Sequence, residues 1–477
     1  MQRAFWGARD PFSCVPGTAG AAGRAVQVWA SLNAVRSVLH RGAVMTSLAD
    51  AGAAAAPGQA APAPLSLRLV LAGSIGNTLE WYDFGAYGFL AAIFARNFFP
   101  ADSGFAALLA AYGMMAASFL MRPVGGVIFG HIGDRYGRRH ALYLSAALMC
   151  VSTVAIGLLP TYATAGMAAP ILLLALRLLQ GVSIGGEYSS SVVFLAESAK
   201  PRWRGLLLSL CSMGAMGGTM LGSLVGAATA SFLSQDELIA WGWRMPFFVG
   251  LLLGGTTLWL RHGLQSAPER STEQPRSPLL QAFADDWRAI VICAVINLAG
   301  GVNTYTLFVY LVTYMEQVDG LSPGSALQVN TASMVVAVVL MPMFAALSDV
   351  IGRKRVLVAS LLGFILFGWP LFRLVSGGTE EGAMLGQLGF AVLISAYTGV
   401  SPAVLAELFK RATRCSAAAV SNNVSRGIAG GTAPMVGVYL VSGLHDPMGP
   451  ALYIICIALI SLIATLCMTD RTRLPLP

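Results

Sequence analysis

GHIGDRYGRR at residues 130–139 and AALSDVIGRKR at residues 345–355 are two versions of one short charged element. A second element, LAESAKPRWRG at 195–205, returns as LAELFKRATRC at 405–415. The two elements follow each other in the same order in both parts of the chain, and long apolar segments surround them. We therefore expect a chain of two related halves.

The composition places those halves in a membrane. Of the 477 residues, 56% are hydrophobic and 11% are charged, whereas roughly a quarter of the residues of soluble domains are charged. Several uncharged runs exceed the about 20 residues that a helix needs to cross the hydrocarbon core. Because lipid offers the backbone no hydrogen-bond partners, we expect an all-α polytopic membrane protein. Duplicated halves around a central cavity are typical of secondary transporters.

We predict twelve transmembrane helices in two pseudo-symmetric six-helix bundles. Their expected bounds are 69–94, 106–130, 141–160, 170–195, 205–231, 244–261, 289–315, 325–348, 356–376, 383–406, 415–441 and 450–469. The N-terminal bundle then covers 65–262, a polar cytoplasmic linker 263–288, the C-terminal bundle 289–470 and a short cytoplasmic tail 471–477.

Residues 1–64 are rich in Ala, Gly and Pro, and we expect a disordered, low-complexity extension there. Within it, residues 1–44 are either an over-long reading frame that precedes a natural start at Met45, or a targeting segment.

The net charge of +8 follows the expected topology and does not indicate a nucleic-acid partner. With both termini in the cytoplasm, the loops on that side collect most Lys and Arg residues, and the opposite side keeps only Arg96, Arg244 and Arg373. This asymmetry predicts a multi-pass protein of the bacterial inner (plasma) membrane, with its basic loops at the anionic leaflet. The seven cysteines have no spacing typical of a disulfide framework or a metal site, so we expect neither.

Charged side chains inside the predicted N-terminal helices are the strongest functional candidates, because an ionisable group in hydrocarbon is costly. They are Glu80, Asp83, Arg122, Arg177 and Glu187. A rise of about 1.5 Å per residue puts Glu80, Arg122 and Glu187 at one depth. Asp83 and Arg177 share another. We predict two stacked ion-pair layers, one joining Asp83 to Arg177 and one joining Glu80 or Glu187 to Arg122. We assign the set to proton coupling; the alternative is that the pairs only lock the helices together.

The predicted C-terminal helices contain no acidic residue away from their cytoplasmic ends. They carry hydrogen-bonding side chains and one arginine near mid-membrane, Arg426. An arginine can donate two parallel hydrogen bonds to a carboxylate. We therefore predict substrate contacts from Tyr188, Asn303, Tyr305, Tyr310, Asn422 and Arg426. The alternative for each tyrosine is a place in the core or at the membrane interface.

We expect no enzymatic activity. The G-x-S-x-G pattern at 181–185 lies inside an apolar helix, without the preceding strand that the hydrolase motif needs. The chain also has no P-loop for ATP. We expect no cofactor and no metal, with a proton gradient as the energy source. A glycine ladder at Gly214, Gly218, Gly222 and Gly226 predicts close packing between helices.

Five segments resemble the metabolite:proton symporters of the major facilitator superfamily, a branch that includes proline/betaine, citrate, α-ketoglutarate and shikimate transporters. They are GNTLEWYDFGAYGF (76–89), LMRPVGG (120–126), GHIGDRYGRR (130–139), LRLLQGVSIGGEY (176–188) and WGWRMPFF (241–248). The resemblance covers about residues 69–470 and implies the major facilitator fold. It also implies a gating loop formed by Gly130, Gly133, Asp134, Arg135, Gly137, Arg138 and Arg139, with a weaker copy at Asp349 and Arg353.

We predict a proton-coupled symporter that imports a small organic acid, such as a di- or tricarboxylate, by alternating access. Arg426 stands where a proline/betaine carrier is expected to have an apolar or small residue, which favours an anion. The alternatives are a proton symporter of zwitterionic osmolytes (proline or glycine betaine), a non-transporting sensor and a drug exporter. The expected partners are a small-molecule substrate, protons and the lipid bilayer, without nucleic acid, and the expected functional unit is a monomer.

Overall fold

A computed structural model of the chain describes residues 67–100, 104–136, 138–185, 187–262, 278–411 and 413–477. Within these ranges the secondary structure is helical, with no β-strand. The expected extension at 1–64 and most of the expected linker lie outside the described residues.

The N-terminal half consists of helices that run in the order of the prediction. They are α3 (Leu67–Phe89), α4 (Ala91–Phe98), α5 (Gly104–Leu120), α6 (Arg122–Tyr136), α7 (Arg138–Gly157), α8 (Tyr162–Ala165), α9 (Ala168–Ser183), α10 (Glu187–Ser198), the short 3₁₀ segment η1 (Pro201–Trp203), α11 (Arg204–Phe232), α12 (Gln235–Ala240), the 3₁₀ segment η2 (Gly242–Arg244) and α13 (Met245–His262).

The C-terminal half contains longer helices and three π-helical segments, η3, η4 and η5. Its elements are α14 (Pro278–Tyr305), η3 (Thr306–Tyr310), α15 (Leu311–Gln317), α16 (Pro323–Ile351), α17 (Arg353–Val375), α18 (Glu380–Glu407), α19 (Arg414–Asn422), η4 (Asn423–Gly430), α20 (Gly431–Val438), η5 (Tyr439–Gly443) and α21 (Gly449–Cys467).

Each of the twelve predicted spans corresponds to one helix or to consecutive helical segments. Eight described stretches are long and apolar enough to cross a membrane. The second span breaks between α5 and α6, where Pro123 follows Arg122 and cannot donate a backbone hydrogen bond. The predicted all-α membrane fold is therefore confirmed, with some spans interrupted.

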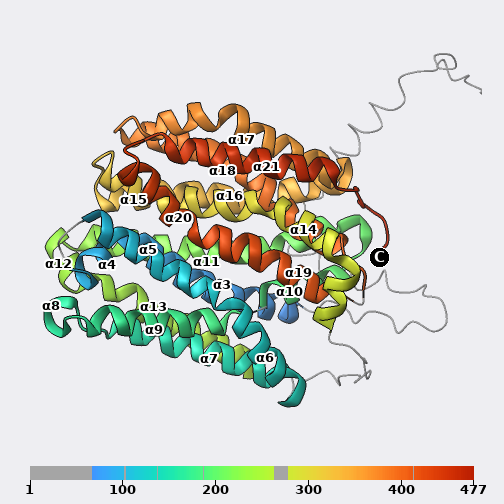
Figure 1. Cartoon of the computed structure of the whole chain (residues 1–477), viewed down its shortest axis with the longest axis horizontal. Coiled ribbons are helices and arrows are strands. Elements are labelled where there is room, and N and C mark those ends of the chain that lie inside the picture. The colour runs from blue at the N-terminus through green and yellow to red at the C-terminus, as the bar shows by residue number, and fades with distance from the viewer. Residues whose placement is uncertain (1–66, 101–103, 137, 186, 263–277, 412) are drawn as a thin grey trace, which may run out of the picture. The chain divides into compact units, whose positions relative to one another are not determined.

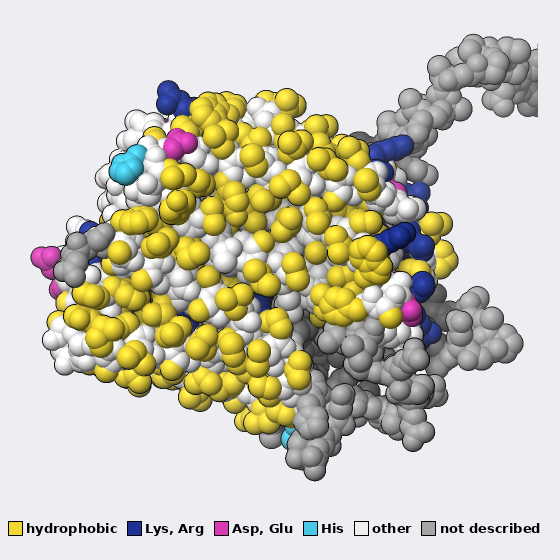
Figure 2. Space-filling model, in the orientation of Figure 1, with side chains coloured by type: hydrophobic (Ala, Val, Ile, Leu, Met, Phe, Trp, Pro, Cys, Tyr) yellow, Lys and Arg dark blue, Asp and Glu magenta, His cyan; other side chains and the backbone are white. Residues whose placement is uncertain are grey.

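The outer surface of these helices suits lipid. Large apolar side chains such as Leu252, Trp259 and Leu366 are exposed. Figure 2 shows apolar side chains over most of the visible face. A surface patch of this extent is too apolar for contact with water. The helices therefore satisfy their backbones internally and present their side chains to hydrocarbon.

Helix α11 joins the two halves, because it packs against α3 of its own half and against α16 of the other (Figure 1). The glycine ladder permits this approach. A Cβ atom at Gly218 would lie 2.3 Å from the carbonyl oxygen of Thr78, and one at Gly222 would lie 3.0 Å from that of Tyr82. The predicted close packing is confirmed, and both α3 and α16 pack against α11.

Candidate functional site

The first buried ion pair of the N-terminal half joins α9 to α3. Arg177 Nη1 lies 3.2 Å from Asp83 Oδ2, and neither side chain is exposed. The same nitrogen donates to Gln180 Oε1 at 2.8 Å, and the guanidinium lies 4.1 Å from the ring centre of Tyr87. The predicted Asp83–Arg177 pair is confirmed as a contact.

The second ion pair joins α6 to α3, where Arg122 Nη2 donates to Glu80 Oε1. Both side chains are buried. The Arg122 guanidinium also lies 4.7 Å from the ring centre of Phe119 and 5.8 Å from that of Trp81. The predicted layer of Glu80 and Arg122 is therefore present. The side chain of Glu187, expected at the same depth, lies outside the described residues.

In the C-terminal half, Arg426 lies on the π-helical segment η4 and is 5% exposed. Its Nη2 donates to Ser401 Oγ at 3.0 Å, and the guanidinium lies 5.5 Å from the ring centre of Tyr188. A Cβ atom at Gly300 would lie 3.3 Å from Nη2, so a glycine there keeps room for the guanidinium. Single π-helical turns of this kind are frequent at functional sites.

The side chain of Tyr305 lies near charged groups of both halves. Its ring stacks on Trp81 at 5.9 Å and meets Phe119 edge-on at 5.4 Å. The hydroxyl is buried and interacts electrostatically with four charged groups, those of Arg122, Glu80, Arg426 and Arg177. These contacts define a central site that is shared by α3, α6, α9, α14 and η4.

Several buried polar atoms in or near this central site have no hydrogen-bond partner among the described residues. They are both amide atoms of Asn77 and Asn303, Trp81 Nε1, the Tyr305 hydroxyl, Asn422 Oδ1 and the Nε atoms of Arg122 and Arg426. A buried polar group without a partner costs about 1–3 kcal/mol. Such a set is suited to a polar ligand that supplies the missing partners.

Of the residues predicted to contact substrate, most belong to this central site. Asn422 lies one turn before Arg426 on the same helical run. Tyr310 is the exception, because its ring packs against Tyr112 and Tyr314. Trp81 and Asn77 were not predicted, although both stand in the helix that carries Glu80 and Asp83.

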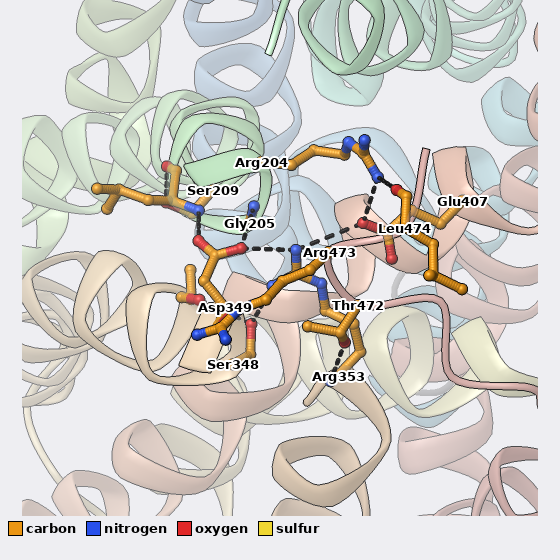
Figure 3. A network of polar contacts seen from close by, with 12 residues as sticks. Arg204, Gly205, Ser209, Ser348, Asp349, Arg353, Glu407, Thr472, Arg473 and Leu474 are labelled. Carbon is orange, nitrogen blue, oxygen red and sulfur yellow. Dashed lines mark hydrogen bonds and ion pairs between the residues drawn. The ribbon is translucent and has the colours of Figure 1, made fainter. Parts of the chain in front are cut away.

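At one end of the molecule, which we call the basic end, six charged residues form a latch between the halves: Glu197, Arg204, Asp349, Arg353, Glu407 and Arg414. Figure 2 shows Lys and Arg side chains gathered along the right-hand edge of the view, the side on which Figure 1 marks the C-terminus. The Asp349 carboxylate accepts hydrogen bonds from the backbone nitrogens of Gly205 and Leu206, both at 2.9 Å (Figure 3). It thereby caps the N-terminus of α11, where a negative charge is favourable.

The rest of the latch consists of ion pairs. Arg204 lies 3.1 Å from Glu407, and Arg414 lies 2.8 Å from Glu197. Each of these pairs joins the N-terminal half to the C-terminal half. Arg353 reinforces the latch from within the C-terminal half, at 2.7 Å from Asp349 and 3.4 Å from Glu407.

The residues after α21 also reach the latch. Leu474 O accepts from Arg204 at 3.2 Å, and Arg473 Nε donates to Asp349 O at 2.8 Å. Glu197, Arg204, Glu407 and Arg414 were not predicted as gating residues. Their recurrence in the duplicated element could have indicated a gating role, because a glutamate and an arginine stand at the same positions of that element in both halves.

Seven of the nine residues in the predicted gating set have surroundings that the structure does not describe. They are Gly130, Gly133, Asp134, Arg135, Gly137, Arg138 and Arg139. Only Asp349 and Arg353 of that set have described contacts.

One expectation about the C-terminal half is wrong. The helical stretch that was predicted to end at residue 315 continues to Gln317 as α15. This helix therefore includes Glu316, which lies at the end of the molecule away from the latch. We call this end, where α4, α12 and residues 318–322 lie, the opposite end. Helix α18 likewise begins with Glu380 and Glu381, so the C-terminal helices include three acidic residues remote from the basic end.

Comparisons with known proteins agree with the architecture. Residues 69–269 match the family model of sugar (and other) transporters, and residues 303–476 match that of the major facilitator superfamily. The crystal structure of a D-xylose–proton symporter superposes with a TM-score of 0.68 over 86% of this chain and 98% of that one, at 20% identity. At that identity the likeness supports the fold alone.

Curated relatives are more similar in sequence. The proline/betaine transporter of Salmonella typhimurium is 34% identical over 423 residues, which cover 86% of this chain and 84% of the relative. A putative proline/betaine transporter of Staphylococcus aureus is 36% identical over 400 residues, or 82% and 86% of the two chains. The glycine betaine/proline/ectoine/pipecolic acid transporter of Dickeya dadantii is 34% identical over 423 residues. The chain therefore belongs to the major facilitator superfamily of membrane transporters, in the branch that contains the proline/betaine transporters.

Proposed function

We propose that this protein is a proton-coupled symporter that imports a small zwitterion of the proline/betaine class by alternating access. One observation supports this more than any other. Six arginines are buried in the described part of the chain, and five of them have a carboxylate partner. The exception, Arg426, lies in the central site.

The charge balance favours one substrate carboxylate over two or three. Arg122 and Arg177 are already neutralised by Glu80 and Asp83, so one buried arginine among the described side chains is available to an anionic group. A di- or tricarboxylate would bring further negative charges into a site without matching cations, and an uncompensated buried charge is strongly unfavourable. The names of the curated relatives agree with this reading. The zwitterion that was the alternative therefore replaces the organic acid as the proposed substrate.

The cationic end of such a substrate has suitable neighbours. The rings of Trp81 and Tyr305 stack at 5.9 Å, and Tyr188 lies under Arg426. Aromatic faces attract quaternary ammonium groups, most strongly when water is excluded. A ligand carboxylate at Arg426 would place its cationic end among these rings.

Proton coupling is assigned to Glu80 and Asp83. When a proton neutralises one of these carboxylates, its arginine loses the ion pair and the helices that it joined are released. In this proposal the basic end faces the cytoplasm, and the latch must open there before the substrate leaves. A protonated and loaded carrier would then reorient more readily than a half-loaded one.

Uptake into proteoliposomes with an alkaline interior tests the substrate and the coupling together. We expect accumulation of labelled glycine betaine or proline, and its loss when an ionophore collapses the pH gradient. Labelled citrate and α-ketoglutarate should not accumulate. Accumulation of a dicarboxylate without betaine would reinstate the organic-acid reading. Uptake that ignores the pH gradient would contradict the coupling.

Two variants locate the substrate carboxylate. Arg426→Gln should raise the KM for betaine, since it removes the donors and the charge. Arg426→Lys keeps the charge but not the planar pair of donors, so its KM should lie between those of the wild type and Arg426→Gln. An unchanged KM in Arg426→Gln would exclude Arg426 from substrate binding.

A further inference from the structure

A cavity of about 190 Å³ lies at the opposite end, between elements of the two halves. A buried water needs roughly 10–15 Å³, so there is room for a small solute. The N-terminal half contributes Phe89 and Arg96 from α3 and α4, and Leu238 from α12. The C-terminal half contributes Glu316 and Gln317 from α15, and Leu327 from α16.

Two opposite charges meet in this cavity without pairing. Arg96 interacts electrostatically with Glu316, yet the described structure contains no ion pair or hydrogen bond between the two side chains. Most of the remaining lining is apolar. A ligand that carries both a negative and a positive group could contact both charges at once, whereas a simple ion would leave one of them without a partner.

Near Glu316 of the cavity, α15 also contacts α5 of the N-terminal half. One turn before Glu316 on the same helix, Thr313 Oγ1 shares a hydrogen bond of 2.7 Å with the Tyr112 hydroxyl of α5. Glu316 also interacts electrostatically with Tyr112. The Tyr112 ring meets the ring of Tyr310, which ends the π-helical segment that begins directly after Tyr305. Along this helical run Tyr310, with its neighbour Tyr112, comes between Glu316 of the cavity and Tyr305 of the central site; we call this tyrosine pair the tyrosine layer.

We infer that this cavity is a second, weaker binding site for the zwitterionic substrate, with Arg96 as the partner of its carboxylate and Glu316 as the partner of its cationic group. The inference depends on the proposed substrate class. Because each charge comes from a different half, a ligand bound here would hold the two halves at the distance seen in the structure. It would also raise the local substrate concentration above the tyrosine layer.

Equilibrium dialysis of the full-length protein in nanodiscs with labelled glycine betaine tests the inference. We expect two components in the wild type. Arg96→Gln and Glu316→Gln should each weaken one component about tenfold or more, and Arg426→Gln should weaken the other about 10- to 100-fold. Arg373→Gln and Glu380→Gln are matched controls, because both side chains are exposed, carry the same charges and do not line the cavity. Both controls should keep two components.

The outcomes separate this inference from the proposed function. A single component in the wild type, or two components unchanged in both cavity variants, would overturn the second site and leave the central site intact. No betaine binding by a wild type that unfolds cooperatively would overturn the proposed substrate, and the second site with it. Exchange of the charges in Arg96→Glu/Glu316→Arg offers a positive test, since a zwitterion can bind in the reversed orientation and restore the weaker component.

Discussion

The two halves treat buried charge differently. In the N-terminal half, Arg122 and Arg177 each have a carboxylate, so the buried set is close to neutral. In the C-terminal half, Arg426 has the Ser401 hydroxyl and a tyrosine ring but no described carboxylate. Desolvating a charge costs several kcal/mol unless a partner compensates it. In our proposal the first half is complete without a ligand, whereas the second half is completed by one.

The largest expected effect comes from breaking a pair in the N-terminal half. Asp83→Asn removes the charge that compensates Arg177, and both side chains are fully buried. Breaking a buried pair costs about 3–5 kcal/mol. We expect a clearly lower melting temperature in detergent and no uptake. The double variant Asp83→Asn/Arg177→Gln should recover part of the stability but not the transport. A single variant that melts like the wild type would remove the contrast between the halves.

The same kind of change in the C-terminal half should have the opposite sign for stability. Arg426→Gln removes a buried charge that has no carboxylate among the described side chains, so the ligand-free protein should melt at the same or a higher temperature. Charged hydrogen bonds contribute about 1.5–3 kcal/mol, so betaine affinity should fall about 10- to 100-fold. Thermal-shift titration with betaine measures both quantities. A lower melting temperature without ligand would indicate a structural role for Arg426.

The ion pairs that cross between the halves should affect the conformational equilibrium more than the stability. Glu407→Gln weakens the contacts with Arg204 and Arg353, and the basic end should open more often. Cys211 lies two turns along α11 from Arg204 and is 3% exposed, so its alkylation by N-ethylmaleimide should become several-fold faster. Mass spectrometry of the peptide containing Cys211 measures the rate, with Cys211→Ala as the control. An unchanged rate would show that the latch does not close this end.

The smallest effect is expected for a charge that is only partly buried. Burial alone would raise the pKa of Asp470, but hydrogen bonds from Thr472 and Lys354 outweigh it and hold that pKa below its usual value. The contribution to stability is then present at neutral pH and is lost as the pH falls through the lowered pKa. Asp470→Asn should cost less than about 1 kcal/mol. The difference in melting temperature from the wild type should disappear in acid, and a constant difference would exclude the charge as its cause.

The amino-acid pattern was sufficient for the layout of the chain. The duplicated elements at 130–139 and 345–355, separated by apolar runs, predict two helical halves in a membrane. The depth of each charge along its helix also predicts which layers can form, because the rise per residue is constant. Depth predicted the Asp83–Arg177 layer, and it left Glu80 and Glu187 as equal candidates for the partner of Arg122.

Depth could not predict the contacts that depend on which helix faces meet. The duplicated Glu197 and Glu407 mark the repeat in the sequence, yet their partners Arg414 and Arg204 come from the opposite half. The helix ends at Gln317, two residues beyond the predicted end at residue 315, and this extension includes Glu316 of the cavity. Helix bounds read from hydropathy are uncertain by more than that.

The order of the residues was enough to predict a helical membrane carrier with charges at defined depths, because apolar run length and helical rise are local properties. Which charges are neutralised depends on how the helices pack together. The Coulomb energy of a pair depends on a separation of a few ångströms across helices that are far apart in the chain. Arg426 alone among the buried arginines of the described residues has no carboxylate partner, and for that reason we propose it as the ligand contact.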